Sequence, residues 1–458
     1  MRARSAAAAA GAQITRPALG ILVVVPWDQH HGGVASVVGN LVRQLSRRGH
    51  SVVMLHPEDS NRRGPKRTAW GFQGYGLNLR APVVPGRVVK SVIAFWAFLP
   101  FTLIQLRRII RDHRIECINV HYPLDSFLVL AFCRFLFGVK LVVSIHGDDI
   151  LPEGRRPDRH SLTLRAILLA ADVIIAPSQG FLRDALACFP RLRCRTVAIH
   201  NGIDSSWWEE AERRRMDGRD STFDGRRSRT AETLDPVQTP DLQPRPYLLC
   251  VAAHYERKRL DVLLRAFSAV RAEHPRHTLV LVGDGPLRAD LEALAATLGI
   301  TGAVAFVGDR PPEVVRELLT GCALFVLPTR YESFGIAVVE AMTLGCPVVA
   351  TAVGGVTEII SDGRDGLLVP ADDVAALATA IDRCLSEPAF AAALGEAAAV
   401  YARERFNAAR MAGRYEAELT RLVSGRGHET PRDEEAAQRR NSLPVRSTRA
   451  LHAPRVVR

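Results

Sequence analysis

Two glutamates with seven residues between them, Glu332 and Glu340, are the side chains best placed for chemistry. A short, β-rich apolar run at residues 323–327 predicts a buried strand before them, and the pattern from about Phe334 onward predicts a helix. Glu332 then lies in the loop before the helix and Glu340 about two turns inside it, roughly 12 Å away at the helical rise. Ionised carboxylates accept hydrogen bonds, so hydroxyl groups are their natural ligands.

The first amides of this predicted helix form a second binding feature. They have no intrahelical partners, and they lie at the positive end of the helix dipole, so an anion is stabilised there. The residues around this position are Ser333, Phe334, Gly335 and Ile336. Hydroxyls at both ends of a ligand with phosphate between them describe a nucleotide sugar. A surface helix with two solvated glutamates has the same spacing, so the neighbouring motifs must carry the interpretation.

The stretch and the residues after it resemble the retaining glycosyltransferases called group 1 or family GT4, which have the two-domain GT-B fold. The match includes residues 332–335, 340–342, 345–350, 354–355 and 362–370, and the resemblance extends over roughly residues 20 to 420. In that family the second glutamate binds the ribose hydroxyls of the donor nucleotide, and the first contacts the donor sugar. The resemblance implies these roles for Glu340 and Glu332.

Three further motifs follow predicted strands, at the edge where open α/β sheets bind their ligands. Gly33 follows the first predicted strand, and the resemblance implies that it faces the donor phosphates and the acceptor. His146 ends a later strand, and the resemblance implies that it faces the donor sugar. Gly283 and Gly285 belong to a Gly-Asp-Gly-Pro turn that the family places close to the nucleotide.

The basic residues depart from the family pattern. The family has Gly-Arg, a gap and then Lys-Gly, with the arginine and lysine neutralising the donor pyrophosphate. Here two alanines, Ala252 and Ala253, stand in place of Gly-Arg, and Lys258 is retained. Arg257 and Arg259 are the candidates for the missing charge, and the sequence does not choose between them.

Transfer of a sugar from a nucleotide requires fixed positive potential at the diphosphate more than a strong base, because negative charge grows there as the bond breaks. Lys258 and the amides of residues 333–336 would supply it, with His146 and Glu332 as the other catalytic candidates. No two aspartates have the Asp-x-Asp spacing of a common metal site. We therefore expect metal-independent transfer without a cofactor, and retention of the anomeric configuration follows from the resemblance alone.

Two other functions fit the same sequence. A sugar-nucleotide epimerase can share the two-domain architecture, and it needs no acceptor. A catalytically weak partner subunit that binds nucleotide sugars is the second, and the alanine at position 253 motivates it. The sequence does not identify the donor base, the sugar or the acceptor, which could be a glycan, a lipid-linked sugar or a small molecule.

The chain of 458 residues is too long for one core, and strands alternate with helices through both halves. This pattern predicts an α/β protein with two Rossmann-like, doubly wound parallel sheets and a cleft between them. The expected division is a disordered tail, an acceptor-side domain, a flexible charged insert, a nucleotide-sugar-binding domain and a disordered basic tail. Their residues are 1–18, 19–204, 205–246, 247–423 and 424–458.

The net charge of +12 comes from arginines scattered along the chain, which argues against a nucleic-acid partner. Eight cysteines occur without a C-x-x-C pair, which argues against structural zinc and a disulfide framework and favours the cytosol.

Residues 91–106 are helical and unusually apolar, and two arginines follow them. The run is too short to span a bilayer, and we favour a helix buried against the sheet. The alternative is a helix whose outer face rests on an anionic inner membrane leaflet. Residues 61–86 before it are rich in Gly, Pro and Arg and predict an exposed loop.

Overall fold

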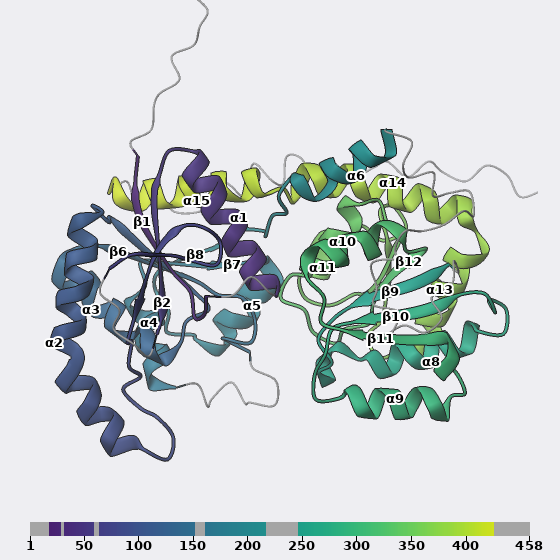
Figure 1. The fold of residues 1–458 in the computed structure, drawn as a ribbon, viewed down its shortest axis with the longest axis horizontal. Helices are drawn as coiled ribbons and strands as arrows, with labels where there is room; N and C mark the ends of the chain where they lie inside the picture. The colour runs from purple at the N-terminus through teal and green to yellow at the C-terminus, as the bar shows by residue number, and fades with distance from the viewer. Residues whose placement is uncertain (1–17, 29–31, 59–63, 152–160, 217–245, 426–458) are drawn as a thin grey trace, which may run out of the picture.

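The computed structural model describes residues 18–28, 32–58, 64–151, 161–216 and 246–425. They form two α/β domains side by side, each built on a largely parallel sheet (Figure 1). The predicted fold class is therefore confirmed. The predicted disordered tails lie outside the described residues except at their inner edges, as does the part of the predicted insert from 217 to 245.

The first domain contains an eight-stranded sheet in the order β3-β4-β2-β1-β5-β6-β7-β8. Only β3, which pairs with β4, is antiparallel. The strands are β1 (Gly20–Val24), β2 (Ser51–Pro57), β3 (Lys66–Arg67), β4 (Gln73–Leu77), β5 (Cys117–His121), β6 (Lys140–Ser144), β7 (Val173–Ala176) and β8 (Arg195–Ala198). The central strands are buried on both faces, as their continuous apolar runs require.

Helices cover both faces of this sheet. On one face Leu22 and Val24 of β1 pack with residues of α2 to α5, and on the other Ile21 and Val23 pack with α1 and α15. The helices are α1 (Gly33–Arg47), α2 (Val88–Asp112), α3 (Leu128–Phe137), α4 (Leu162–Ala170), α5 (Gln179–Cys188) and α15 (Ala408–Val423).

The second domain has a six-stranded, fully parallel sheet in the order β11-β10-β9-β12-β13-β14. Its strands are β9 (Tyr247–Val251), β10 (Thr278–Val282), β11 (Val304–Gly308), β12 (Leu324–Leu327), β13 (Val348–Thr351) and β14 (Leu367–Val369). Its helices are α6 (Ser206–Met216), α8 (Leu260–Val270), α9 (Arg288–Thr297), α10 (Pro312–Gly321), α11 (Ile336–Thr343), α12 (Val356–Ile359), α13 (Val374–Ser386) and α14 (Pro388–Arg405).

The expected loop at residues 61–86 is in part an edge ribbon, because β3 and β4 form within it. Glycine lowers strand propensity, which hid the strand in the sequence. Here the missing side chain is needed, because a Cβ on Gly74 would lie 2.4 Å from Cγ2 of Thr68 and 3.2 Å from the Met54 carbonyl oxygen. The glycines therefore let the ribbon close against β2.

The division into domains differs from the expected one at both ends of the second unit. Residues 206–216, expected in the flexible insert, form α6, which packs on the second domain through Trp207 and Trp208. Helix α15 returns to the first domain, where Tyr415 and Leu419 join its core (Figure 1). The chain passes from one domain to the other near Ile203 and returns near Phe406. These two crossing segments are hydrogen-bonded, with Ile203 N donating to Phe406 O at 2.8 Å.

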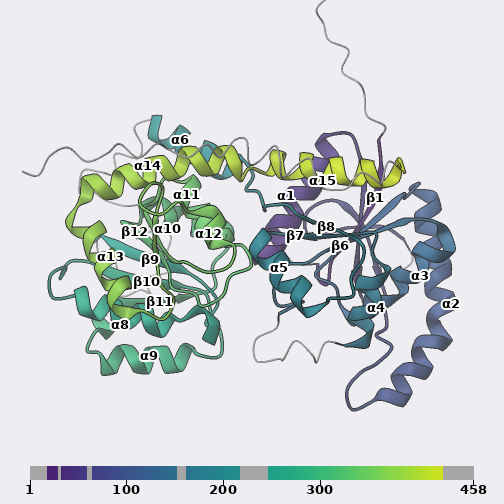
Figure 2. The same cartoon turned by 180° about the vertical axis from the view of Figure 1, so that it is seen from behind.

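Helix α2 is the largest departure from expectation, because the prediction of a buried helix is wrong. Phe95, Leu99 and Leu106 face the domain, but Trp96 is 58% exposed and Phe101 65% exposed. With 25 residues, α2 is the one helix among the described residues that is long and apolar enough to cross a membrane. It packs lengthwise on α3 at the outer edge of the domain (Figure 2).

Helix α14 supports the functional helix α11 through a close backbone contact, which yields a stability prediction. A Cβ on Gly395 of α14 would lie 2.2 Å from the carbonyl oxygen of Gly345, so Gly395→Ala forces α14 away from its neighbour. We expect the free energy of unfolding to fall by roughly 1–3 kcal/mol, measured by chemical denaturation. Gly302→Ala is the control, because its Cβ meets nothing within 4 Å. Equal effects of the two substitutions would contradict the packing argument.

Candidate active site between the two sheets

A cleft of about 600 Å³ lies between the domains and is lined by residues of both. Every residue predicted for the site except Gly285 lines it. From the first domain these are Gly33 and His146, and from the second Lys258, Gly283, Glu332, Ser333, Phe334, Gly335, Ile336 and Glu340. Residues separated by up to about 300 positions are thus brought together at the carboxyl edges of two sheets.

Two helices begin at the cleft, one from each domain. Helix α11 begins at Ile336 after Gly335, whose φ of 110° favours glycine, and α1 begins at Gly33 after Gly32, whose φ is 98°. A Cβ on Gly33 would lie 2.9 Å from Cγ2 of Ile336, so glycine is needed for the two helix starts to approach. Their free amides make this part of the cleft suited to an anion.

Two adjacent cations that line the cleft are each paired with a carboxylate. Lys258 Nζ lies 2.5 Å from Glu332 Oε2, and both side chains are mostly buried. Arg257 pairs with Asp148 across the two domains. Arg259 does not line the cleft and pairs with Asp261 and Asp372. Of the two arginines left open by the sequence, Arg257 is therefore the one placed beside Lys258.

Ser333 joins the two halves of the site. Its Oγ donates to the carbonyl oxygen of His146 at 2.5 Å, and its own carbonyl accepts from Ser178 Oγ at 2.6 Å. A second link is Glu358, whose carboxylate accepts from the Gly180 amide at 2.7 Å and lies 3.0 Å from His200 Nε2. Burial alone would raise the pKa of Glu358, but these hydrogen bonds lower it.

Glu340 lies on the first two turns of α11, and burial raises its pKa to about 8. At pH 7 the carboxyl group is therefore largely protonated until a ligand supplies hydrogen-bond donors. Ribose hydroxyls are such donors, and they favour the ionised form.

His146 follows β6, and its backbone amide donates to the Asp149 carboxylate at 3.0 Å. Burial lowers the pKa of the His146 imidazole to about 4, so the ring is neutral at physiological pH. A neutral ring can hold one N–H donor and one acceptor in fixed directions.

The remaining predicted residues shape the walls of the cleft. Phe334 is buried, and its ring contacts those of His200 and Phe406. Gly283 has a φ of 122°, and a Cβ there would lie 2.2 Å from the Ala252 carbonyl oxygen. Gly285, which does not line the cleft, lets the turn approach the backbone of His254, where a Cβ would lie 2.7 Å from the carbonyl oxygen.

Sequence reasoning missed several polar residues of the cleft. Asp148 was visible as part of the His-Gly-Asp-Asp run, but its partner Arg257 is 109 positions away. Tyr122 follows β5 with a φ of 55°, which a sequence does not reveal. Other polar residues that line the cleft include Ser36, Asn201, Asp309 and Arg310. Asn201 belongs to the Asn-Gly-x-Asp motif after the last strand of the first domain, whereas Asp309 and Arg310 stand in a loop without a recognisable motif.

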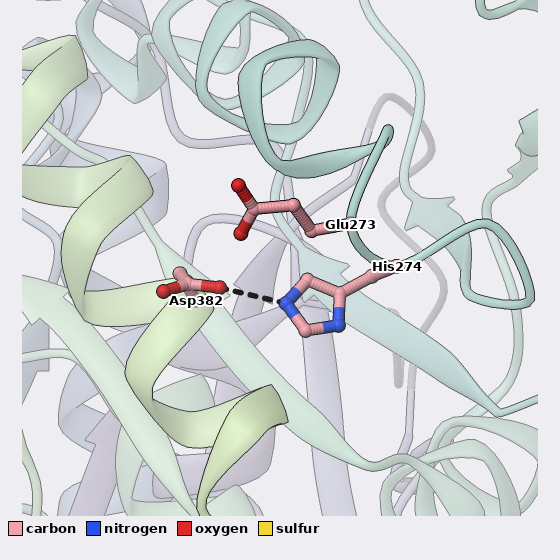
Figure 3. A group of neighbouring side chains, drawn as sticks. All are labelled: Glu273, His274 and Asp382. Carbon is pink, nitrogen blue, oxygen red and sulfur yellow. Dashed lines mark hydrogen bonds and ion pairs between the residues drawn. The ribbon is translucent and has the colours of Figure 1, made fainter.

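One group of side chains within the described residues could hold a metal ion: Glu273, His274 and Asp382 (Figure 3). His274 Nε2 lies 2.8 Å from Asp382 Oδ1, so this pair already satisfies both groups. None of the three lines the cleft. We interpret the group as a hydrogen-bonded contact that joins α13 to the turn after α8.

Comparison with known proteins agrees with this geometry. The family model described as Glycosyltransferase Family 4 matches residues 31–207, and the model Glycosyl transferases group 1 matches residues 234–400. The alpha-D-kanosaminyltransferase of Streptomyces kanamyceticus is 30% identical over 298 residues, which cover 61% of this chain and 71% of that enzyme. The chain belongs to the group 1, family GT4 glycosyltransferases.

Other similar proteins cover nearly nine tenths of this glycosyltransferase. The GDP-mannose-dependent alpha-(1-6)-phosphatidylinositol monomannoside mannosyltransferase of Mycolicibacterium smegmatis is 28% identical and covers 89% of this chain and 98% of its own. Sucrose-phosphate synthase from Thermosynechococcus elongatus aligns with a TM-score of 0.68 at 22% identity, over 89% of this chain and all of its own. Anabaena HepE in complex with UDP and glucose aligns with a TM-score of 0.62 at 20% identity, over 88% and 99%. The fold is therefore GT-B.

The raised pKa of Glu340 gives a pH prediction for this glycosyltransferase. If the ionised carboxylate accepts ribose hydroxyls, donor binding should tighten as pH rises toward 8 and then level off. We expect the donor Kd to fall roughly tenfold between pH 7 and pH 9, as measured by calorimetry. Glu340→Gln should bind more weakly at pH 9 and lose this dependence. If Glu340→Gln keeps the wild-type dependence of the donor Kd on pH, another group titrates and the assignment of Glu340 to the ribose is wrong.

Proposed function

We propose that this glycosyltransferase moves a sugar from a nucleotide-sugar donor to an acceptor with retention of configuration and without a metal ion. The observation that carries the proposal is the Lys258–Glu332 pair at the start of α11, inside a cleft that both sheets face. A cation and free helix amides lie there between two carboxylates. A nucleotide sugar has the matching order, with a diphosphate between the hydroxyls of its sugar and those of its ribose.

The diphosphate would lie between the starts of α1 and α11. Lys258 would leave Glu332 to bind it, and Arg257 would leave Asp148 to supply the charge that the family obtains from an arginine at the position of Ala253. Each carboxylate would keep its cation in place before the donor binds. After Lys258 turns to the diphosphate, Glu332 would be free to accept a hydrogen bond from a hydroxyl of the donor sugar. Positive potential fixed in advance is the contribution that transfer needs most.

Glu340 would accept the ribose hydroxyls, and His146 would face the donor sugar. Since the cleft already offers two side-chain cations and two helix starts, charge on the leaving diphosphate can be neutralised by the protein itself. Support for retention comes from family membership, and the relatives named for GDP-mannose and kanosamine transfer show that donors vary among the chain's relatives.

The first test is transfer by the purified protein from a panel that includes GDP-mannose and UDP-glucose. We expect one donor to be used in the presence of an acceptor, to give a product with the donor's anomeric configuration by NMR, and to react within about twofold of its normal rate in EDTA. Conversion of the donor without acceptor would indicate the epimerase, and binding without turnover the partner subunit. If EDTA lowers the transfer rate and magnesium or manganese restores it, the proposal of metal-independent transfer is wrong.

Three variants test the phosphate site, and Arg257→Asn and Arg259→Asn form a matched pair among them. Arg257→Asn and Lys258→Ala should each lower kcat by roughly 100-fold, because each removes a charge that stabilises the leaving diphosphate. Arg259→Asn should stay close to wild type, because Arg259 lies outside the cleft and asparagine tolerates its left-handed φ of 51°. Equal losses at 257 and 259 would contradict the assignment of the missing arginine.

We also propose that the acceptor is presented at an anionic membrane surface on the cytosolic side. The α2–α4 apolar surface, which we define by its exposed side chains, carries this proposal. These are Ile93, Trp96, Phe101 and Ile104 of α2, Phe135 and Leu136 of α3, and Leu162 and Leu169 of α4. Exposed apolar residues gathered on three adjacent helices are unusual on a protein surrounded by water.

Charge complements this surface. Arg107, Arg108 and Arg111 are exposed near the end of α2, where phospholipid headgroups would lie if the apolar side chains entered the acyl boundary. Each basic residue contributes about 1 kcal/mol near an anionic leaflet, and salt weakens this attraction. A relative named for transfer to a phosphatidylinositol mannoside supports a lipid acceptor.

Liposome co-sedimentation tests the membrane proposal. We expect binding to anionic vesicles at low salt, less binding at high salt, and a loss of at least about fivefold in Trp96→Glu. Val400→Glu is the control, because Val400 is 71% exposed on α14 in the other domain. Protein that stays in the supernatant under all conditions would overturn the proposal and favour a soluble acceptor.

A further inference from the structure

A chain of buried hydrogen bonds runs from the C-terminal helix to the candidate catalytic histidine. Tyr415 of α15 donates to Ser144 Oγ at 3.3 Å, and Ser144 Oγ donates to Asn119 Oδ1 at 2.9 Å. Asn119 Nδ2 lies 3.0 Å from His121 Nε2, and His121 Nδ1 lies 3.0 Å from His146 Nε2. Asn119, His121 and Ser144 are almost wholly buried, and the chain reaches the cleft at His146.

The direction of this chain determines where the protons are. Because Asn119 turns its oxygen to Ser144, its Nδ2 faces His121, and an amide nitrogen can only donate. His121 Nε2 is then the acceptor, so the one proton of the neutral ring sits on Nδ1 and is donated to His146 Nε2. By the same logic His146 carries its own proton on Nδ1.

Both rings are neutral in this arrangement. Burial lowers the pKa of His121 well below its usual range, and the nearby His146 lowers it further. The His121 ring stacks on Tyr415 with a centroid distance of 6.3 Å, and its centroid lies 5.3 Å from that of the tilted His146 ring. Partners at both ring nitrogens hold the ring in this orientation, so the order of its nitrogens is fixed.

We propose that His121 is a positioning residue that holds His146 as the Nδ1-protonated tautomer, so that His146 offers a hydrogen-bond donor to the cleft. The tautomer itself is independent of the proposed function. Its use, donation to a hydroxyl oxygen of the donor sugar, rests on that function. With the opposite tautomer His146 would offer only a lone pair, and it could accept from a sugar hydroxyl but not donate to it.

The tautomer is measured directly by long-range ¹H–¹⁵N correlation spectra of protein labelled in its 14 histidines. Signals are assigned by comparison with His146→Gln and His121→Phe. At pH 7.5 we expect His121 and His146 each to show a protonated Nδ1 and an unprotonated Nε2. A protonated Nε2 on His146, or averaging between the two tautomers, overturns the proposal without any activity being needed.

Asn119→Asp reverses the chain, because a carboxylate at this position can only accept. A neutral His121 then donates through Nε2 and accepts through Nδ1, which moves the proton of His146 to Nε2. We expect the protonated nitrogen of both histidines to switch from Nδ1 to Nε2. We also expect kcat to fall about tenfold, because one hydrogen bond is lost, while the donor KM changes by less than about twofold.

Asn40→Asp is the matched control, because it adds the same charge to the same domain and contacts neither histidine; its side chain bonds to Gly202 O and to Arg43. We expect wild-type tautomers and wild-type kcat. If Asn119→Asp switches the tautomers but keeps full kcat, the positioning role of His121 is overturned while the proposed function stands. If Asn119→Asp does not fold, the wild-type spectrum still decides the tautomer.

Discussion

Ser333 holds the two halves of the cleft in one arrangement, and the rest of the site depends on it. Its hydroxyl donates to the His146 carbonyl, and its carbonyl accepts from Ser178 at the start of α5. Because Ser333 lies between Glu332 and the first turn of α11, these bonds fix the carboxylate, the free amides and the histidine relative to one another. Hydrogen bonds between the two segments that cross from one domain to the other, at Ile203 and Phe406, support the same relation.

Charge in the cleft is balanced before any donor enters. Lys258 and Arg257 each face a carboxylate, so neither of these two cations is left unpaired in the cleft. In the proposed function, a diphosphate would take the place of the carboxylates beside these two cations. Burial alone raises the pKa of Glu340, so its carboxyl group carries no net charge at neutral pH that would need a cation beside it.

The sequence predicted what periodicity and family motifs encode. Strands buried on both faces and the Glu332-to-Glu340 stretch were predictable, because each leaves a local pattern. The edge strand β4 was not, since Gly74 reads as loop until its contact with Thr68 is seen. The exposure of α2 was not either, because a helix that is apolar all round does not tell which of its faces is covered. Pairings such as Arg257–Asp148 depend on how two domains close, which no local pattern records.

The most direct test of the account is a crystal structure with the nucleoside diphosphate of the preferred donor. We predict that the diphosphate lies between the starts of α1 and α11, with Lys258 turned from Glu332 to the phosphate and Glu340 bonded to the ribose hydroxyls. A diphosphate bound elsewhere, with the Lys258–Glu332 pair intact, would contradict the central claim that this pair marks the leaving-group site.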